Sequence, residues 1–230
     1  MDGKALKKAR ESKNWTQKDA ARTLGVTQAY LSMLETGCRS VSTPFARKAL
    51  KVLDLPPTAL PLQTPTEGAT SSGRHDYGVD LAALGYPGFA YLRTRVRRNP
   101  AGVLLDALNE RDLDARVAEG LPWLALTYDD MDWDWLARNA KVSDVQNRLG
   151  FAVSLAKKIA EGRSDRDRAQ KLQAYLAVLE RARLAREDTF CHDSMTGAER
   201  AWLREHRSST ARHWNLLTDM EDKHLAYARS

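Results

Sequence analysis

Apolar residues in the first quarter of the chain recur with the period of an α-helix. Around residue 30 they are Val26, Tyr30, Leu31 and Leu34. Spacings of four, one and three residues place these side chains on one face of a helix with 3.6 residues per turn. Similar spacings flank this segment, and together they predict four short helices, over residues 5–12, 17–24, 28–36 and 44–53.

Residues that favour helix ends delimit these segments. Thr16 and Thr27 stand where an N-cap hydroxyl would accept a hydrogen bond from an amide of the first turn. Gly37 stands where a left-handed residue is expected after a helix. Thr43 followed by Pro44 is the order expected at the start of the fourth helix. Most of the helix boundaries are therefore predicted by local signals.

Only Gly25, Val26 and Thr27 separate the second and third predicted helices. Three residues allow nothing but a sharp turn, and Gly25 can supply the positive φ that such a turn needs. The sequence therefore predicts a helix-turn-helix.

The rest of the chain also shows mainly helical spacing. Ser143 with Gln146, and Thr196 with Glu199, form capping-box patterns. Because no alternation of apolar and polar residues persists, we predict an all-α fold with a larger helical C-terminal domain. The helices expected here cover residues 100–109, 113–126, 133–139, 143–161, 165–188, 196–205 and 211–228.

A stretch rich in Pro, Thr, Ser and Gly, residues 56–73, separates the two helical regions and loses helical spacing after Leu62. This composition is typical of a linker. We predict a helix-turn-helix domain over residues 1–60, a linker over 61–75, and a helical domain over 76–230 that dimerises or binds a partner or effector.

Composition indicates a folded protein without a membrane span. Apolar residues make up 43% of the 230 residues, yet no apolar run approaches the roughly 18 residues of a transmembrane helix. The first residues lack the apolar centre of a signal peptide, so we expect a cytoplasmic protein. Cys38 and Cys191 lie far apart in the sequence, which predicts neither a disulfide nor a zinc site.

Positive charge is concentrated at one end of the chain. Residues 1–60 hold 11 Lys and Arg against 5 Asp and Glu, whereas residues 61–230 hold 25 of each kind. The net charge of +6 therefore comes from the first quarter alone. This asymmetry predicts a polyanionic partner for the helix-turn-helix and a different partner, or none, for the body.

The segment TQKDAARTLGVTQAYLSMLETGCRSVSTPFARKALKVLDL resembles the Xre/Cro-type helix-turn-helix domain of phage repressors and bacterial regulators. The resemblance covers about residues 4–56 and rests on Thr16-Gln17, Ala21, Gly25, Thr27-Gln28, Leu31 and Glu35-x-Gly37. Thr27 and Cys38 depart from the commoner Ser and Lys or Arg at those positions. We therefore expect one DNA-backbone contact to be weaker, or to come from Arg39 instead.

The resemblance implies that the third helix lies in the DNA major groove while the second crosses the backbone. The part of the third helix that remains after its apolar face is assigned carries no charge. Its amide could pair with adenine, its apolar groups could contact thymine methyls, and its hydroxyl could bond to either base. The predicted base-reading residues are Gln28, Ala29, Ser32 and Met33.

Contacts with the DNA phosphates set position without reading sequence. The residues predicted to make them are Gln17, Lys18, Thr27, Tyr30, Arg39, Ser40 and Ser42, and Arg10 and Lys13 are expected to add positive field. The alternative is a helical packing module whose basic residues are merely solvated. We favour DNA binding because the turn, the caps and the charge asymmetry agree. Glu35 has no second carboxylate nearby in the sequence, so we expect it to pair within the module rather than to act as a catalyst.

Residues 128–135, YDDMDWDW, combine acids with aromatic side chains. They could form a docking surface for a basic partner or a metal-binding loop. The simpler interpretation, which we favour, is that the acids cap the start of a helix and that a Trp is buried. The candidate docking residues are Asp129, Asp130, Asp132, Trp133, Asp134 and Trp135.

No other pattern predicts catalytic or metal chemistry. Cys191, His192, Asp193, His206 and His213 have metal-ligand side chains but no regular spacing, so we predict no metal site. Neither a glycine-rich phosphate loop nor a Ser-His-Asp arrangement is evident. We therefore predict no catalytic residues, no cofactor and no enzymatic activity.

These patterns predict a sequence-specific DNA-binding transcriptional regulator. One reading helix per chain suggests a homodimeric repressor on double-stranded DNA with an inverted-repeat operator. The architecture is also similar to antitoxins encoded beside abortive-infection nucleotidyltransferase toxins, which implies an autoregulating antitoxin with a cognate toxin. Two alternatives stay open: a regulator whose body encloses a small molecule, and a protein-interaction adaptor in phage defence.

Overall fold

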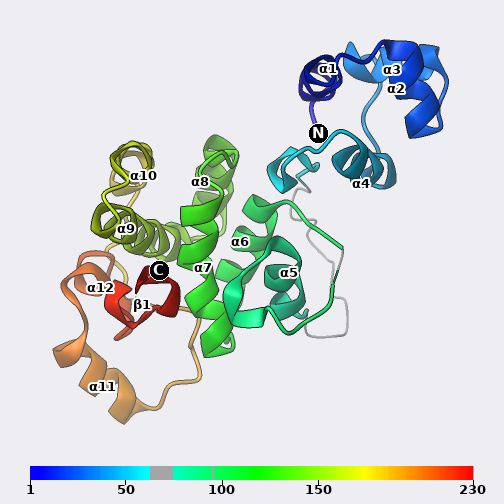
Figure 1. Cartoon of the computed structure of the whole chain (residues 1–230). Coiled ribbons are helices and arrows are strands. Elements are labelled where there is room, and N and C mark those ends of the chain that lie inside the picture. Colours follow the sequence, from blue (N-terminus) through cyan, green and yellow to red (C-terminus); the bar gives the residue numbers. More distant parts are fainter. Residues whose placement is uncertain (63–74, 95, 230) are drawn as a thin grey trace. The chain divides into compact units, whose positions relative to one another are not determined.

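A computed structural model describes residues 1–62, 75–94 and 96–229 (Figure 1). The chain divides into two compact units, Met1–Ser71 with Arg97–Asn99, and Ser72–Val96 with Pro100–Ser230. The described residues form twelve α-helices and one two-stranded sheet, which confirms the all-α prediction. Most of the predicted linker lies outside the described residues.

The first unit is a small helical domain with one apolar centre. Leu6 of α1, Leu24 of α2, and Leu31 and Leu34 of α3 are almost fully buried and pack together with Ala49 of α4. The chain then continues through a short 3-10 helix to Leu60, which is also buried. The elements are α1 (Gly3–Ser12), α2 (Gln17–Leu24), α3 (Gln28–Glu35), α4 (Thr43–Val52) and η1 (Pro57–Ala59).

The local signals predicted these boundaries well, with one exception. Thr16 and Thr27 are the N-caps of α2 and α3, and Gly37 has the expected left-handed conformation after α3. The predicted Thr43 cap is wrong, because α4 begins one residue earlier, with Ser42 as N-cap and no side-chain hydrogen bond.

The second unit is built around the long helix α9, which packs against both α7 and α10 and is buried along most of its length. The helices are α5 (Tyr77–Leu84), η2 (Pro87–Phe89), α6 (Pro100–Asn109), α7 (Ala115–Thr127), α8 (Trp133–Val142), α9 (Gln146–Gly162), α10 (Arg166–Glu180), α11 (Gly197–His206), α12 (Ser209–His213), η3 (Asp222–His224) and η4 (Ala226–Arg229).

Three predicted features of the second unit are wrong. Ser143 does not cap α9, because Asp144 has a left-handed φ of 57° and Ser143 instead ends α8. The helix expected over 165–188 ends at Glu180. The helix expected over 211–228 stops at His213, since Asn215 has a φ of 54° and turns the chain away. Asn and Asp tolerate this left-handed conformation better than most residues.

One helix and the small sheet were not predicted. Helix α5 is short, and its glycine and flanking turn residues hid its period. Strands β1 (Asp188–Thr189) and β2 (Leu216–Leu217) pair in parallel over two residues each. The predicted capping box at Thr196 and Glu199, in contrast, is present at the start of α11.

None of the described helices is both long enough and apolar enough to cross a membrane.

Candidate nucleic-acid interface

Helices α2 and α3 form a helix-turn-helix through a turn of three residues. Gly25 has a φ of 68°, which a residue with a Cβ adopts only with strain. The Val26 amide donates to the Ala21 carbonyl at 2.9 Å, and the Thr27 hydroxyl accepts a hydrogen bond from the Tyr30 amide at 3.2 Å. The turn therefore fixes the start of α3 relative to α2.

Helix α3 has a buried side and an exposed side. Leu31 and Leu34 fill the core. Three of the four predicted base-reading residues are exposed, and Ser32 is half-buried. Among the described residues, the side chains of Gln28 and Ser32 form no hydrogen bond, so their polar atoms are available to a partner. Met33 leaves 40% of its surface exposed, which is unusual for a large apolar side chain.

Arg39 lies beside this exposed side of α3. Its guanidinium carbon is 5.0 Å from the centroid of the Tyr30 ring, within the range of a cation–π contact. Its amide donates to the Met33 carbonyl at 3.1 Å, which ties the loop after Gly37 to α3. The Tyr30 ring in turn packs edge-on against Phe45. A positive charge is thus held next to the uncharged residues of α3.

The other predicted phosphate ligands have varied surroundings. Lys18, Ser40 and Ser42 are exposed, and the exposed Thr27 uses its hydroxyl as the cap of α3. Gln17 is half-buried, and its amide nitrogen donates to Glu35 Oε2 at 2.9 Å. Since that nitrogen carries a second hydrogen, a phosphate contact by Gln17 stays a prediction.

Arg10 is not the surface charge that the sequence suggested. Only 7% of the residue is exposed, and its guanidinium makes two hydrogen bonds to the Glu35 carboxylate, from Nε at 2.7 Å and from Nη2 at 3.0 Å. Nη1 also donates to the Trp15 carbonyl at 2.9 Å. The expectation that Glu35 pairs within the module is confirmed.

This pair joins α1 to the end of α3, and Gln17 links α2 to the same carboxylate. Burial alone would raise the pKa of Glu35, but the hydrogen bonds from Arg10 and Gln17 and the charge of Arg10 outweigh it and lower that pKa. Close backbone packing supports the same contact, because a Cβ on Gly3 would lie 2.1 Å from the Leu34 carbonyl oxygen. The pair therefore orients the helix that carries the candidate base-reading residues.

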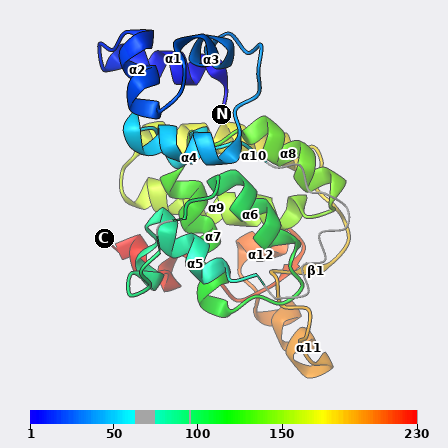
Figure 2. The same ribbon diagram turned by 90° about the vertical axis from the view of Figure 1, so that its right-hand side faces the viewer.

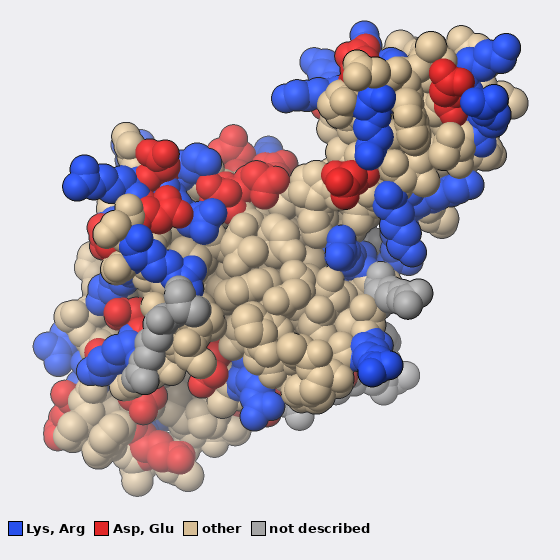
Figure 3. All heavy atoms as spheres, in the orientation of Figure 1, with Lys and Arg blue, Asp and Glu red and all other residues tan. Residues whose placement is uncertain are grey.

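The charge asymmetry read from the sequence is visible on the surface. Figure 3 shows Lys and Arg side chains over much of the visible face of the first unit. Around α9 and α10 of the second unit, basic and acidic side chains alternate instead. The basic surface thus belongs to the unit that carries the helix-turn-helix.

The acidic segment before α8 is largely structural. Asp132 is the N-cap of α8, and its carboxylate accepts from the Trp135 amide at 2.9 Å. Trp133 is buried and stacks on Tyr175 with ring centroids 4.3 Å apart. The capping interpretation therefore holds for these residues.

The remaining acids of this segment differ in their surroundings. Asp129 forms an ion pair with Lys171 at 2.8 Å. Asp130 and Asp134 are exposed, and Trp135 is half-buried. Docking of a basic partner at these positions stays a prediction.

Arg148 is a central residue of the body that the sequence did not reveal. It is buried in α9 and donates to both carboxylate oxygens of Asp188 at 2.9 Å. Its Nη1 also donates to the carbonyls of Leu108 and Glu110. This arginine therefore joins α9, the end of α6 and β1, and no sequence pattern signalled these distant partners.

The two cysteines have different environments. Cys38 is exposed, whereas Cys191 is buried beside Arg148, and burial raises the pKa of the Cys191 thiol to about 12. Cys191 is therefore protonated at neutral pH and a poor nucleophile. In the described part of the chain, no group of three or more His, Cys, Asp or Glu residues could hold a metal ion.

The fold and this surface define a helix-turn-helix DNA-binding domain. Residues 6–60 match the family described as Helix-turn-helix, so the chain carries an Xre/Cro-type domain there, as its sequence resemblance indicated. The match supports a DNA-binding transcriptional regulator. The comparison with curated proteins gave no match, and neither did the comparison with solved structures.

Proposed function

We propose that this regulator recognises a specific DNA sequence through the exposed side of α3. The supporting observation is that Gln28 and Ser32 expose polar groups without partners among the described residues, while Arg39 is held beside them. A reading surface needs free donors and acceptors for base edges, and a positioning surface needs cations for phosphates. Both are present at one place.

A single substitution tests this proposal. We expect Gln28→Ala to weaken binding to the best operator by about 1–3 kcal/mol, because one bidentate base contact is lost, with little change on random DNA. Gln173→Ala removes another exposed glutamine, from α10, and is the matched control. Fluorescence anisotropy with both DNAs measures the difference. An equal loss on random DNA would show that Gln28 positions the protein rather than reads sequence.

We further propose that the regulator is a homodimeric repressor. Each chain carries one reading helix in the described residues, and two-fold symmetric regulators read inverted repeats with half-sites about one helical turn apart. Footprinting of the chain on its own promoter should protect two such half-sites, and transcription from that promoter should fall. A footprint that covers a single half-site, together with a monomer in sedimentation experiments, would contradict the dimer.

The sequence resemblance of the whole architecture to antitoxins supports a toxin as the partner of the second unit. The exposed acids Asp130 and Asp134 supply charge for a basic protein surface. In that case the neighbouring gene encodes a nucleotidyltransferase-like toxin, and co-expression relieves its toxicity. An isolated gene, or a neighbour whose toxicity persists on co-expression, would remove this role and leave DNA binding intact.

A further inference from the structure

The second unit contains a hollow of about 500 Å³ beside the start of α7. Its walls come from α7, the segment after β1, α11, and the chain that follows β2. Most of the residues that line it are apolar. A volume of this size is within the range of about 300–1,000 Å³ that holds small organic molecules in proteins.

The apolar part of this hollow belongs to a small hydrophobic cluster. Met195, Leu203 and Leu217 are buried against one another, and all three line the hollow together with Phe190. Leu203 is the buried residue of α11, and both Figure 1 and Figure 2 show α11 extending away from the other helices of its unit. A wall held by so little buried surface can shift to admit a ligand without unfolding α9 and its neighbours.

Two acidic residues are among those that line the hollow. Glu119 is half-buried and Asp219 is exposed, and neither side chain forms a hydrogen bond or an ion pair with another described residue. Among the described residues that line the hollow there is no Lys or Arg. The basic residue types that line it are two histidines, His192 and His224.

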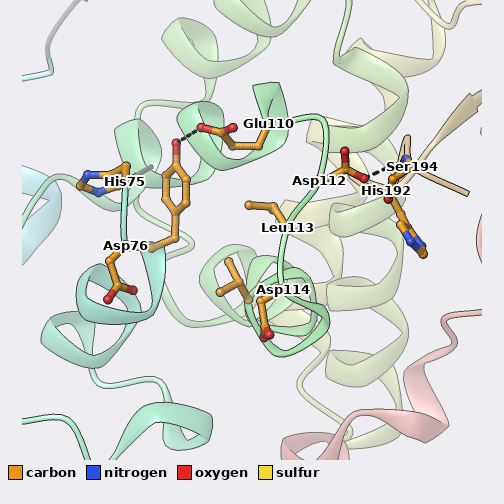
Figure 4. Close-up of a pocket in the computed structure, with 10 residues that line it drawn as sticks. His75, Asp76, Glu110, Asp112, Leu113, Asp114, His192 and Ser194 are labelled. Atoms are coloured by element: carbon orange, nitrogen blue, oxygen red, sulfur yellow. Dashed lines mark hydrogen bonds between the residues drawn. The ribbon is translucent and has the colours of Figure 1, made fainter. Parts of the chain in front are cut away.

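An adjoining hollow of about 590 Å³ has the same sign of charge. The two share Leu113 and His192, and Figure 4 shows the carboxylates of Glu110, Asp112 and Asp114 around the second one. No Lys or Arg in the described chain lines this hollow either. Acidic side chains therefore line the second hollow as well, together with His75 and His192.

The charge of Glu119 is also felt by its neighbours. Burial and the nearby Glu119 carboxylate raise the pKa of Tyr86 to about 12. The same two causes contribute to a raised pKa of Tyr227, whose hydroxyl donates to the Glu119 carbonyl at 2.8 Å. The charges of Arg116 on Tyr86 and of Arg163 on Tyr227 act in the opposite direction and are weaker.

We propose that this hollow binds a small organic cation, with the apolar body of the ligand against Met195, Leu203 and Leu217 and its positive group at Glu119 and Asp219. The apolar lining supplies affinity, and the unpaired carboxylates exclude anions and select cations. This binding does not require that the first unit bind DNA.

Two dyes of the same xanthene skeleton and opposite charge test the proposal on the full chain without DNA. Fluorescence anisotropy should show saturable binding of the cation rhodamine 123 and no binding of the anion fluorescein. Glu119→Gln and Asp219→Asn keep the shape of each side chain and remove its charge, so each should weaken rhodamine binding by about tenfold. Glu205→Gln, at an exposed glutamate outside both hollows, should leave it unchanged.

A second variant tests the location independently of charge. Ala118 is buried at the wall of the hollow, and Ala118→Leu should abolish rhodamine binding by filling the space. Circular dichroism of each variant checks that it is folded. Equal binding of fluorescein, or unchanged rhodamine affinity in folded Glu119→Gln and Asp219→Asn, would overturn the proposal. Dye binding is measured without DNA, and operator binding is measured without dye. A failure of the dye proposal therefore leaves the DNA-binding proposal untouched, and the reverse also holds.

Discussion

Single residues decide how helix α3 is oriented, and Arg10 is the clearest case. Its guanidinium is buried against Glu35, whereas sequence composition placed it among surface cations. A buried ion pair adds little net stability compared with apolar residues of similar size, but removal of one partner leaves an uncompensated charge in the core. The pair therefore fixes geometry more than it stabilises the domain.

We expect Arg10→Met to destabilise the first unit by about 3–5 kcal/mol, because the Glu35 carboxylate would stay buried without its cation. The double variant Arg10→Met/Glu35→Leu should lose much less, since no charge remains buried. Hydrogen exchange of the amides in α1–α3, followed by mass spectrometry of the full chain, measures both. Lys8→Met removes an exposed cation from the same helix and is the control. Additive losses in the double variant would contradict this account.

The lowered pKa of Glu35 gives this unit a specific pH dependence. Because the pKa is lower in the folded than in the unfolded chain, the pair stabilises the fold above the unfolded pKa of about 4.3. That stabilisation is lost as the pH falls through the lower, folded pKa. We expect the amides of α1–α3 to lose exchange protection as the pH falls below about 5. The midpoint of this loss should follow the pKa of Glu35 in the folded chain. The Arg10→Met/Glu35→Leu variant should lack this component.

At the scale of elements, local signals predicted where helices begin, whereas contacts between distant residues changed where some of them end. Thr16, Thr27 and Thr196 begin helices as expected, because a cap depends on residues within one turn. Helix α10 ends earlier than predicted. Just after its end, the buried side-chain amides of Gln146 and Asn147 in α9 donate to the backbone carbonyls of Ala182 and Leu184. No single-sequence pattern contains such partners, which lie more than 30 residues away.

The candidate site shows the same division. The exposed side of α3 was read from helical period alone, since it depends on residues within two turns of one another. The partners of Arg10 and Arg148 were missed because each pairs across a long stretch of sequence. The hollow in the second unit was invisible for the same reason, as its walls come from four separate segments.

Helix α9 depends on close approach at Gly150. A Cβ at this position would lie 2.4 Å from the ring of Trp214, which is buried and held by a hydrogen bond to Ser154. We expect Gly150→Ala to destabilise the second unit by about 1–3 kcal/mol, because the ring cannot move aside freely. Gly102→Ala, where a Cβ meets nothing within 4 Å, should instead be neutral or stabilise α6 by up to about 1 kcal/mol. Thermal unfolding followed by circular dichroism compares the two; equal effects would show that the ring relaxes.

At the scale of the whole molecule, charge divides the work between the two units. The first carries the basic surface and the candidate base-reading helix, and the second carries balanced charge, a buried arginine network and an acidic, apolar hollow. We therefore expect electrostatic attraction to DNA to come from the first unit alone, and ligand or partner binding to be confined to the second. This division can be measured without knowing the operator.

Salt dependence separates cations that contact phosphates from those that do not. For each phosphate contact, the logarithm of DNA affinity falls with the logarithm of salt concentration with a slope of about −0.9. We expect Arg39→Gln to reduce the slope by about one contact, because its guanidinium lies beside α3. Gln28→Ala should lower affinity at every salt concentration without changing the slope, since a neutral amide releases no counterion. Arg186→Gln, an exposed arginine of the second unit, should change neither. If Arg186→Gln reduced the slope as much as Arg39→Gln, the second unit would also contact the DNA. A local phosphate contact would then exist in a unit whose overall charge is balanced.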